Sequence, residues 1–338
     1  MSEPRPLRVD PFIVALLAAA VLGFLAPAQG LAATVVDYLK TVAITLLFFL
    51  QGVRLQRSAV IAGITQWRLQ LLTLGCTFLL FPLVGVALRA VLPHLLGDSL
   101  WLGVLYLCAL PSTVQSSIAF TSIARGNVPA AICAATVSNL LGIVLTPLLV
   151  TLLLQMHASS SPMEQIRAIT EQLLLPFILG QVVSRWLRPW AFRHPILLSI
   201  SDRGSIVLVV YAAFSAAVIA GTWNRVHWSD VLKLLALSAI VLALALAATR
   251  WASRLARFST EDEIATVFCG SKKSLATGVP MANVLFSGAV AGLIILPVMI
   301  FHQLQLMACA YLARRYAERP QPDSRDARLH PERTIARP

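Results

Sequence analysis

Charged residues are scarce in this chain. They make up 12% of its 338 residues, whereas a soluble globular protein has roughly 25%. Hydrophobic residues account for 58%, and the mean hydropathy is +0.78. This composition predicts a polytopic membrane protein whose main surroundings are the lipid bilayer.

The sequence also lacks the motifs of enzymes and metal sites. It contains no HExxH, no paired Asp and no Gly-x-Ser-x-Gly segment. Its five cysteines lie in apolar runs without ligand-like spacing, so we interpret them as small core residues. No cleavable signal peptide is evident. We therefore expect no enzyme and no cofactor, with sodium considered only as a coupling ion.

Ten apolar segments are long enough to cross a bilayer as helices, which takes about 20 residues each. We expect an all-α fold from these segments. They cover approximately residues 11–28, 35–53, 69–89, 101–124, 129–155, 166–187, 204–222, 231–250, 263–286 and 289–312.

The basic residues are distributed unevenly between the loops. Of 27 Lys and Arg, 20 fall in the termini and in the loops on one side of the predicted membrane, and 4 fall on the other side. The positive-inside rule therefore places both termini in the cytoplasm of a cell (inner) membrane protein. The net charge of +12 is thus explained by topology, and we expect no nucleic acid partner. The oligomeric state is left open.

The two halves of the chain resemble each other. Cys108 and Cys269 each precede a cluster of small polar residues, and the following spans carry a glycine five residues before a proline. Five spans per half is an odd number, so the halves should enter the membrane in opposite orientations. The expected parts are a cytoplasmic N-terminus (1–10), a first five-helix repeat (11–155), a second inverted repeat (166–312) and a disordered basic cytoplasmic tail (313–338).

Polar clusters interrupt the fourth and ninth spans. Residues 111–117 read PSTVQSS and residues 270–278 read GSKKSLATG. Pro and Gly weaken helices there, and unwound backbone at membrane depth is tolerated only inside protein or against water. We expect both stretches to be non-helical and to form a substrate or ion site with nearby polar residues. The candidates are Thr77, Ser112, Thr113, Gln115, Ser116, Ser117, Thr136, Ser138, Asn139, Ser271, Lys272, Lys273, Ser274 and Thr277.

The segments FFLQGVRL, LPSTVQSS, ARGNVPAA, SNLLGIVLTPLL and GSKKSLATGVPMA resemble the bile acid:sodium symporter family, in its divergent YfeH-type branch. The resemblance covers most of residues 10–312. It implies ten helices in two inverted five-helix repeats, with broken fourth and ninth helices. It also implies a panel domain of spans one, two, six and seven, and a core domain of the other six.

The resemblance further implies two sodium sites, which are degenerate in this chain. The family's Ser-Asn pair falls on Ser116 and Ser117, its third-helix glutamine on Thr77, and its ninth-helix glutamate on Ser271. Its fifth-helix hydroxyls map loosely to Ala131 and Ala135. No acidic residue lies between residues 264 and 311, so no metal site is certain.

Lys272 and Lys273 stand where the carboxylate is lost. One lysine would replace a sodium ion, coordinated by Ser116, Ser117 or Asn139, while the other would face the cavity and bind an anion. The alternative is that both snorkel to an interface. We interpret His302, Gln303 and Gln305 as interhelical hydrogen-bonding groups.

The leading interpretation is a secondary transporter that moves an organic, amphipathic anion by alternating access. The alternatives are a sodium-independent or proton-coupled carrier, or a membrane regulatory protein without transport.

Overall fold

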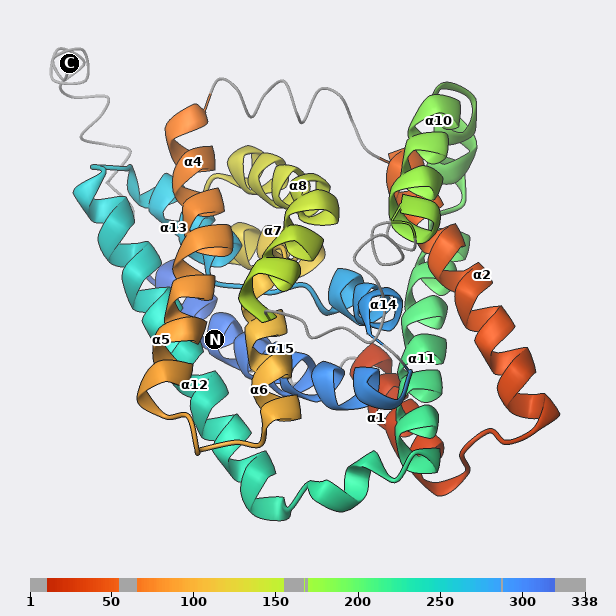
Figure 1. The fold of residues 1–338 in the computed structure, drawn as a ribbon. Coiled ribbons are helices and arrows are strands. Elements are labelled where there is room, and N and C mark those ends of the chain that lie inside the picture. Colours follow the sequence, from red (N-terminus) through yellow and green to blue (C-terminus); the bar gives the residue numbers. More distant parts are fainter. Residues whose placement is uncertain (1–10, 55–65, 155–166, 168–169, 287, 320–338) are drawn as a thin grey trace, which may run out of the picture.

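The computed structural model describes residues 11–54, 66–154, 167, 170–286 and 288–319. Within these residues the secondary structure is helical, without strands. Four helices gather on one side of the molecule (Figure 1). They are α1 (Pro11–Leu25), α2 (Leu31–Arg54), α10 (Leu175–Arg193), which follows the π-helical turn η2 (Thr170–Leu174), and α11 (Pro195–Ile219).

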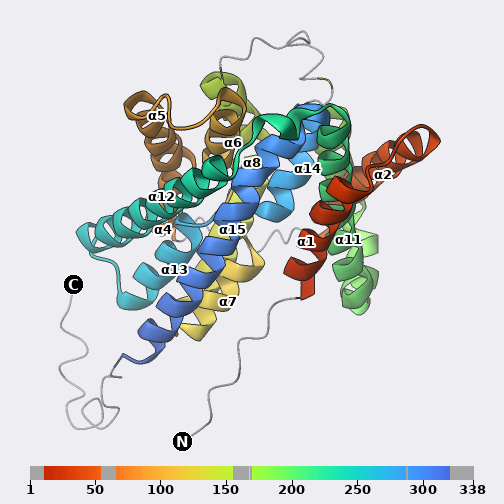
Figure 2. The same cartoon turned by 90° about the horizontal axis from the view of Figure 1, so that it is seen from below.

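The remaining helices form a second group, which contacts the first mainly where α11 packs on α14 and α15. Figure 2 shows α12, α15 and α13 running side by side in this group. Its elements are α4 (Trp67–Gly75), the π-helical turn η1 (Cys76–Leu80), α5 (Phe81–Val91), α6 (Asp98–Ala109), α7 (Gln115–Ile123), α8 (Val128–Leu154), the 3-10 turn η3 (Thr222–Arg225), α12 (Trp228–Leu255), α13 (Thr260–Gly270), α14 (Leu275–Leu285) and α15 (Gly288–Ala317).

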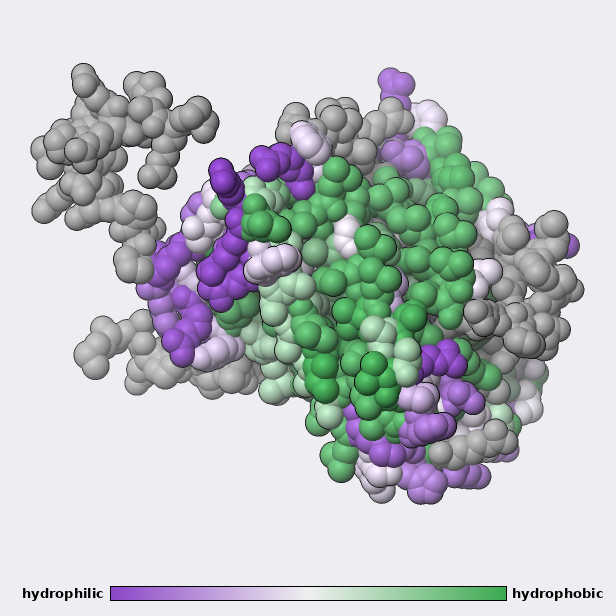
Figure 3. Space-filling view, turned by 60° about the vertical axis from the view of Figure 1, so that its left-hand side comes forward, coloured by the Kyte–Doolittle hydropathy of each residue, from purple (hydrophilic) through white to green (hydrophobic). Residues whose placement is uncertain are grey.

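The described helices have the length and surface of a membrane protein. Six of them are long and apolar enough to cross a bilayer, among the residues described. Their outer faces expose large hydrophobic side chains such as Leu31, Leu152 and Trp251. Figure 3 shows hydrophobic side chains across the middle of one face, with hydrophilic ones gathered toward its edges. A lipid-embedded protein needs such a belt.

Glycines bring α2 and α10 into backbone contact. A Cβ atom at Gly52 would lie 2.1 Å from the Phe177 carbonyl oxygen, and one at Gly180 would lie 2.0 Å from that of Phe49. Only glycine permits such an approach, because a real Cβ needs more than 3 Å. The two helices therefore pack tightly against each other, and the Arg54–Asp202 ion pair also ties α2 to α11.

Two spans are interrupted near their middles. The chain leaves the helix after Ala109 and re-enters it at Gln115, and it does so again between Gly270 and Leu275. Pro111 supplies no N–H to continue α6, while Ser274 caps α14 by accepting a hydrogen bond from the Thr277 N–H (3.2 Å). The non-helical stretches are shorter than predicted, because α7 and α14 begin within residues 111–117 and 270–278.

Several helices are longer than predicted. Helix α11 begins at Pro195 rather than near residue 204, because a proline starts the helix and the charged turn at Asp202 continues it. Helix α15 continues to Ala317, so the first residues of the predicted tail are helical. The predicted N-terminus (1–10), most of the link between the halves and residues 320–338 lie outside the described residues.

Candidate functional site

The two interrupted spans cross, and hydroxyl groups join them. The Ser112 Oγ donates to the Cys269 carbonyl (2.5 Å) and the Ser117 Oγ donates to that of Phe268 (2.9 Å). In return, the Ser274 N–H donates to the Pro111 carbonyl (2.8 Å). The last carbonyls of a helix have no partner within it. The serines thus satisfy the end of α13 from the other span.

Lys273 satisfies the end of α6 in the same way. Its side chain is 1% exposed, and its ammonium donates to the carbonyl oxygens of Thr77 (2.7 Å), Cys108 (2.8 Å) and Leu110 (2.7 Å). An ammonium has three N–H donors, so all three are used. The Phe81 ring lies on its other side, 4.1 Å from Nζ to the ring centre. Lys273 is therefore a fully coordinated buried cation.

The sequence explains why the Thr77 carbonyl is free to accept a hydrogen bond from Lys273. In the π-helical turn η1, each carbonyl accepts from the N–H five residues later, as Cys76 does from Phe81. The corresponding partner of Thr77 is Pro82, which has no N–H. The Thr77 hydroxyl meanwhile donates to the Thr73 carbonyl (2.8 Å). Thr77 thus contributes its backbone oxygen, not its side chain.

Lys272 has a different environment. It is also fully buried, but its ammonium makes one long hydrogen bond, to the Ser116 Oγ at 3.2 Å. Its remaining contacts are with aromatic faces, at 4.5 Å from the Phe120 ring centre and 5.7 Å from that of Phe268. Such contacts stabilise a cation less than full coordination does. Burial of both lysines excludes snorkelling.

Gln305 and Asn139, on two long helices, fix the conformation of the non-helical stretches by hydrogen bonds. Gln305 of α15 accepts from the Lys273 N–H (2.8 Å) and donates to its carbonyl (2.9 Å), as expected for an interhelical hydrogen-bonding group. On α8, Asn139 donates to the Ser112 carbonyl (2.6 Å) and accepts from the Thr277 hydroxyl (2.8 Å). Asn139 therefore connects both breaks.

The other predicted residues divide into two groups. Thr113, Gln115, Ser116, Thr136, Asn139, Ser274 and Thr277 line a cavity of about 610 Å³, a size typical of small-molecule sites. Ser138 lies behind it, where its Oγ accepts from the Ser112 N–H (3.0 Å). Ser271 turns away and donates to the Val267 carbonyl of its own helix (2.6 Å). Neither lysine lines the cavity, contrary to the expectation that one of them would face it and bind an anion.

Both half-helices begin at this cavity. Gln115 and Ser116 open α7, and Leu275 and Ala276 open α14, and all four line it. The N-cap residue of α7, Val114, makes no side-chain capping bond. Helix N-termini present free N–H groups and a partial positive charge, so this end of the cavity suits an anionic group.

The far end of the cavity was not predicted from sequence. Arg54, Asp202 and Arg203 line it, together with apolar side chains that include Leu47 and Phe177. The Arg54 guanidinium donates two hydrogen bonds to Asp202 (2.7 and 2.6 Å), and Arg203 lies over the Phe12 ring. In the sequence these arginines indicated only topology. Asp202, the one acidic residue between Glu171 and Asp230 in the sequence, was the sign that one of them has a structural partner.

These residues do not fit the sodium sites of the resembling family. An ammonium already takes the three carbonyl oxygens at the crossing, and Ser271 turns its hydroxyl away. Hydroxyl and carbonyl oxygens are good sodium ligands, but a fixed ammonium beside them repels a second cation. Within the described part of the chain, no three His, Cys, Asp or Glu are grouped to hold a metal ion.

Residues 10–318 match the SBF-like CPA transporter family. Over 320 residues the chain is 55% identical to "Uncharacterized protein PA2026" of Pseudomonas aeruginosa, covering 94% of this chain and 96% of the relative. It is 48% identical to YfeH of Escherichia coli over 308 residues, 91% of this chain and 93% of YfeH. It is 26% identical to sodium/bile acid cotransporter 7 of Rattus norvegicus over 270 residues, 79% of each chain.

Proposed function

Because the chain belongs to the SBF-like CPA transporter family, we propose that it is a secondary transporter that carries an organic anion without a coupling sodium ion. One observation carries this proposal. The ammonium of Lys273 is coordinated by three carbonyl oxygens at the crossing of two interrupted helices, and the cavity starts beside that crossing. A covalently held cation takes the place of a mobile one.

The cavity favours an amphipathic anion. Its lining combines hydroxyl and amide groups and the starts of α7 and α14 with apolar side chains such as Leu47 and Phe177. At its far end, Arg54 and Arg203 outnumber the single acid Asp202. The charged residues that line it therefore sum to +1, which attracts a carboxylate or sulfate group.

We also propose the architecture behind transport. The chain forms ten helices in two inverted repeats, and α1, α2, α10 and α11 act as a panel against which the other helices move. The matching interruptions before α7 and α14 support the repeat. The glycine-packed α2 and α10 support a rigid panel. Movement between these groups would give alternating access to the cavity.

Both termini are then cytoplasmic, in the inner membrane, as is the end of α10. A cysteine introduced at Arg193, which is exposed, should react with a membrane-impermeant maleimide only after the cells are opened. A cysteine introduced near Asp98, which this topology places on the opposite side of the membrane, should react in intact cells. Labelling of position 193 from outside would refute this orientation.

The proposed function is tested by ligand-induced thermal stabilisation. In a screen of organic carboxylates and sulfates, at least one anion should stabilise the purified protein, and to the same extent in sodium and in choline chloride. Proteoliposomes should then accumulate that anion equally in either salt. Stabilisation that requires sodium would contradict the proposal, as would binding without uptake.

A substitution in α8 places the anion in the cavity. Thr136 lines the cavity, so Thr136→Leu should weaken binding of the selected anion by about tenfold or more, because a bulkier side chain displaces it. Thr151→Leu changes the same helix away from the cavity and should leave the affinity unchanged. Equal affinities in both variants would place the anion elsewhere.

A further inference from the structure

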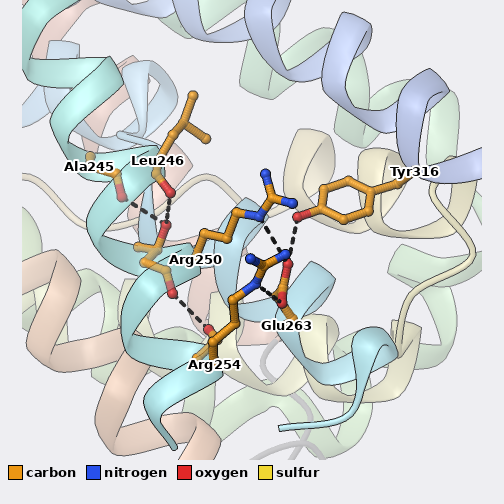
Figure 4. A network of polar contacts seen from close by, with 8 residues as sticks. Ala245, Leu246, Arg250, Arg254, Glu263 and Tyr316 are labelled. Atoms are coloured by element: carbon orange, nitrogen blue, oxygen red, sulfur yellow. Dashed lines mark hydrogen bonds and ion pairs between the residues drawn. The ribbon is translucent and has the colours of Figure 1, made fainter. Parts of the chain in front are cut away.

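A charged cluster joins the ends of α12, α13 and α15 outside the cavity (Figure 4). The Glu263 side chain is 10% exposed and lies 3.4 Å from the Arg250 Nε and 3.1 Å from the Arg254 Nε. The Tyr316 hydroxyl donates to the same carboxylate (2.9 Å). One nearly buried acid thus orients two arginines, and the three charged groups sum to +1.

The two arginines present their other nitrogens to the surroundings. Their side chains are 49% and 60% exposed, and the ion pairs with Glu263 involve the Nε atom of each. Trp251, 68% exposed, and Leu255, 69% exposed, lie on the same turns of α12. Exposed tryptophan beside arginine is typical of the membrane–water interface. The guanidinium forks are therefore placed to meet lipid headgroups.

The position along α12 agrees with this. Helix α12 carries Asp230 in its first turn and Arg250 twenty residues later. At 1.5 Å per residue the two are about 30 Å apart, which is the thickness of the hydrocarbon core. When Asp230 lies at one interface, Arg250 and Arg254 lie at the other, at the depth of lipid phosphates.

A chain of contacts connects this cluster to Lys272. The Tyr316 ring packs edge-on against Phe268, with ring centres 6.3 Å apart. Phe268 in turn contacts Phe120 (5.9 Å), and the Lys272 ammonium lies against both of these rings. Glu263 stands in the first turn of α13, the half-helix that ends two residues before Lys272. The cluster therefore supports the helix that carries the lysine.

We propose that Arg250 and Arg254 bind the phosphate of an anionic phospholipid, and that Glu263 and Tyr316 transmit this binding to α13 beneath Lys272. Arginine forks match phosphate oxygens with paired hydrogen bonds. The added negative charge balances the cluster, because Glu263 offsets only one of the two arginines. Lipid binding thus clamps α12, α13 and α15 together.

The test measures lipid-dependent melting of the full chain in detergent. Phosphatidylglycerol should raise the melting temperature, whereas phosphatidylcholine with the same acyl chains and inorganic phosphate should not. The double variant Arg250→Gln/Arg254→Gln should bind phosphatidylglycerol about thirtyfold more weakly, given the usual contribution of each arginine. The double variant leaves the Glu263 carboxylate without a positive partner, which could itself disturb the fold. The triple variant that also carries Glu263→Gln avoids this and should show the same loss of phosphatidylglycerol affinity.

The matched control is Arg185→Gln/Arg193→Gln. These exposed arginines of α10 lie beside the exposed Trp186 and Trp190. The change in charge and the setting are the same, but among the described residues no acid orients these arginines. This variant should keep wild-type affinity for phosphatidylglycerol. Equal losses in both pairs, equal stabilisation by phosphatidylcholine, or stabilisation by inorganic phosphate alone would overturn the proposal.

Transmission to α13 has its own readout. Tyr316→Phe removes the hydroxyl that contacts Glu263, so it should retain phosphatidylglycerol binding but lose the extra protection of α13 amides from hydrogen exchange that the lipid provides. Unchanged protection in Tyr316→Phe would overturn the transmission step. Neither measurement depends on transport, so this proposal and the proposed function can fail separately.

Discussion

Replacing Lys273 with methionine should lower the free energy of unfolding by about 3 kcal/mol. The substitution leaves the carbonyl oxygens of Thr77, Cys108 and Leu110 without their donor, and each buried unsatisfied group costs about 1–3 kcal/mol. Removing a buried ammonium recovers part of this cost, because the charge no longer has to be desolvated. The melting temperature in detergent should therefore fall by about 4 °C.

Lys272 is the natural comparison, since it is adjacent and equally buried. Lys272→Met loses one long hydrogen bond to Ser116 and keeps apolar contact with two aromatic rings, so its stability should change by less than about 1 kcal/mol. A third variant, Lys233→Met, affects a side chain that is 40% exposed and should be nearly neutral. Equal melting temperatures for Lys273→Met and Lys272→Met would show that the three carbonyls do not need the ammonium.

Gly180→Ala should have the second large effect. The added methyl group would lie 2.0 Å from the Phe49 carbonyl oxygen, so α2 and α10 must separate. Overpacking of this kind costs about 1–3 kcal/mol, and here the nearest neighbours are backbone atoms that cannot rotate away. We expect a lower melting temperature and weaker binding of the selected anion, because Phe177 and Arg54 of the cavity lie on these two helices.

Gly204→Ala is the opposite case and serves as the control. This glycine lies within α11, and a Cβ atom there would meet nothing within 4 Å. Alanine forms helix better than glycine by about 1 kcal/mol, so Gly204→Ala should raise the melting temperature slightly. If both variants changed stability in the same direction, the α2–α10 contact would be looser than the structure indicates.

The helices could be predicted from the sequence because a long apolar run inside a membrane must form all its backbone hydrogen bonds within itself. Their ends were not, since α11 and α15 continue past the apolar region through charged turns that hydropathy cannot distinguish from loops. The breaks were readable as well, from Pro111 and from the Ser and Lys residues around Gly270. Their true length depends on where capping by Ser274 restores the helix.

The role of Lys273 was only half readable. The family resemblance led us to expect one lysine in place of a sodium ion, coordinated by Ser116, Ser117 or Asn139. Instead, three backbone carbonyls from residues far away in sequence coordinate Lys273. Backbone groups leave no trace in residue identity, except at Pro82, which leaves the Thr77 carbonyl without a helical donor. The Arg54–Asp202 pair was missed because sequence separates its members by 148 positions.

Covalent attachment of the cation at the crossing has an electrical consequence. A sodium ion leaves the carrier after each cycle, whereas the ammonium of Lys273 has to return with the protein. In a transporter of the kind proposed, the empty carrier then moves positive charge through the membrane field, and a bound anion neutralises it. One elementary charge crossing 100 mV corresponds to about 2.3 kcal/mol. The membrane voltage would therefore act mainly on the unloaded protein, so the return of the empty carrier is the step whose rate should depend on voltage.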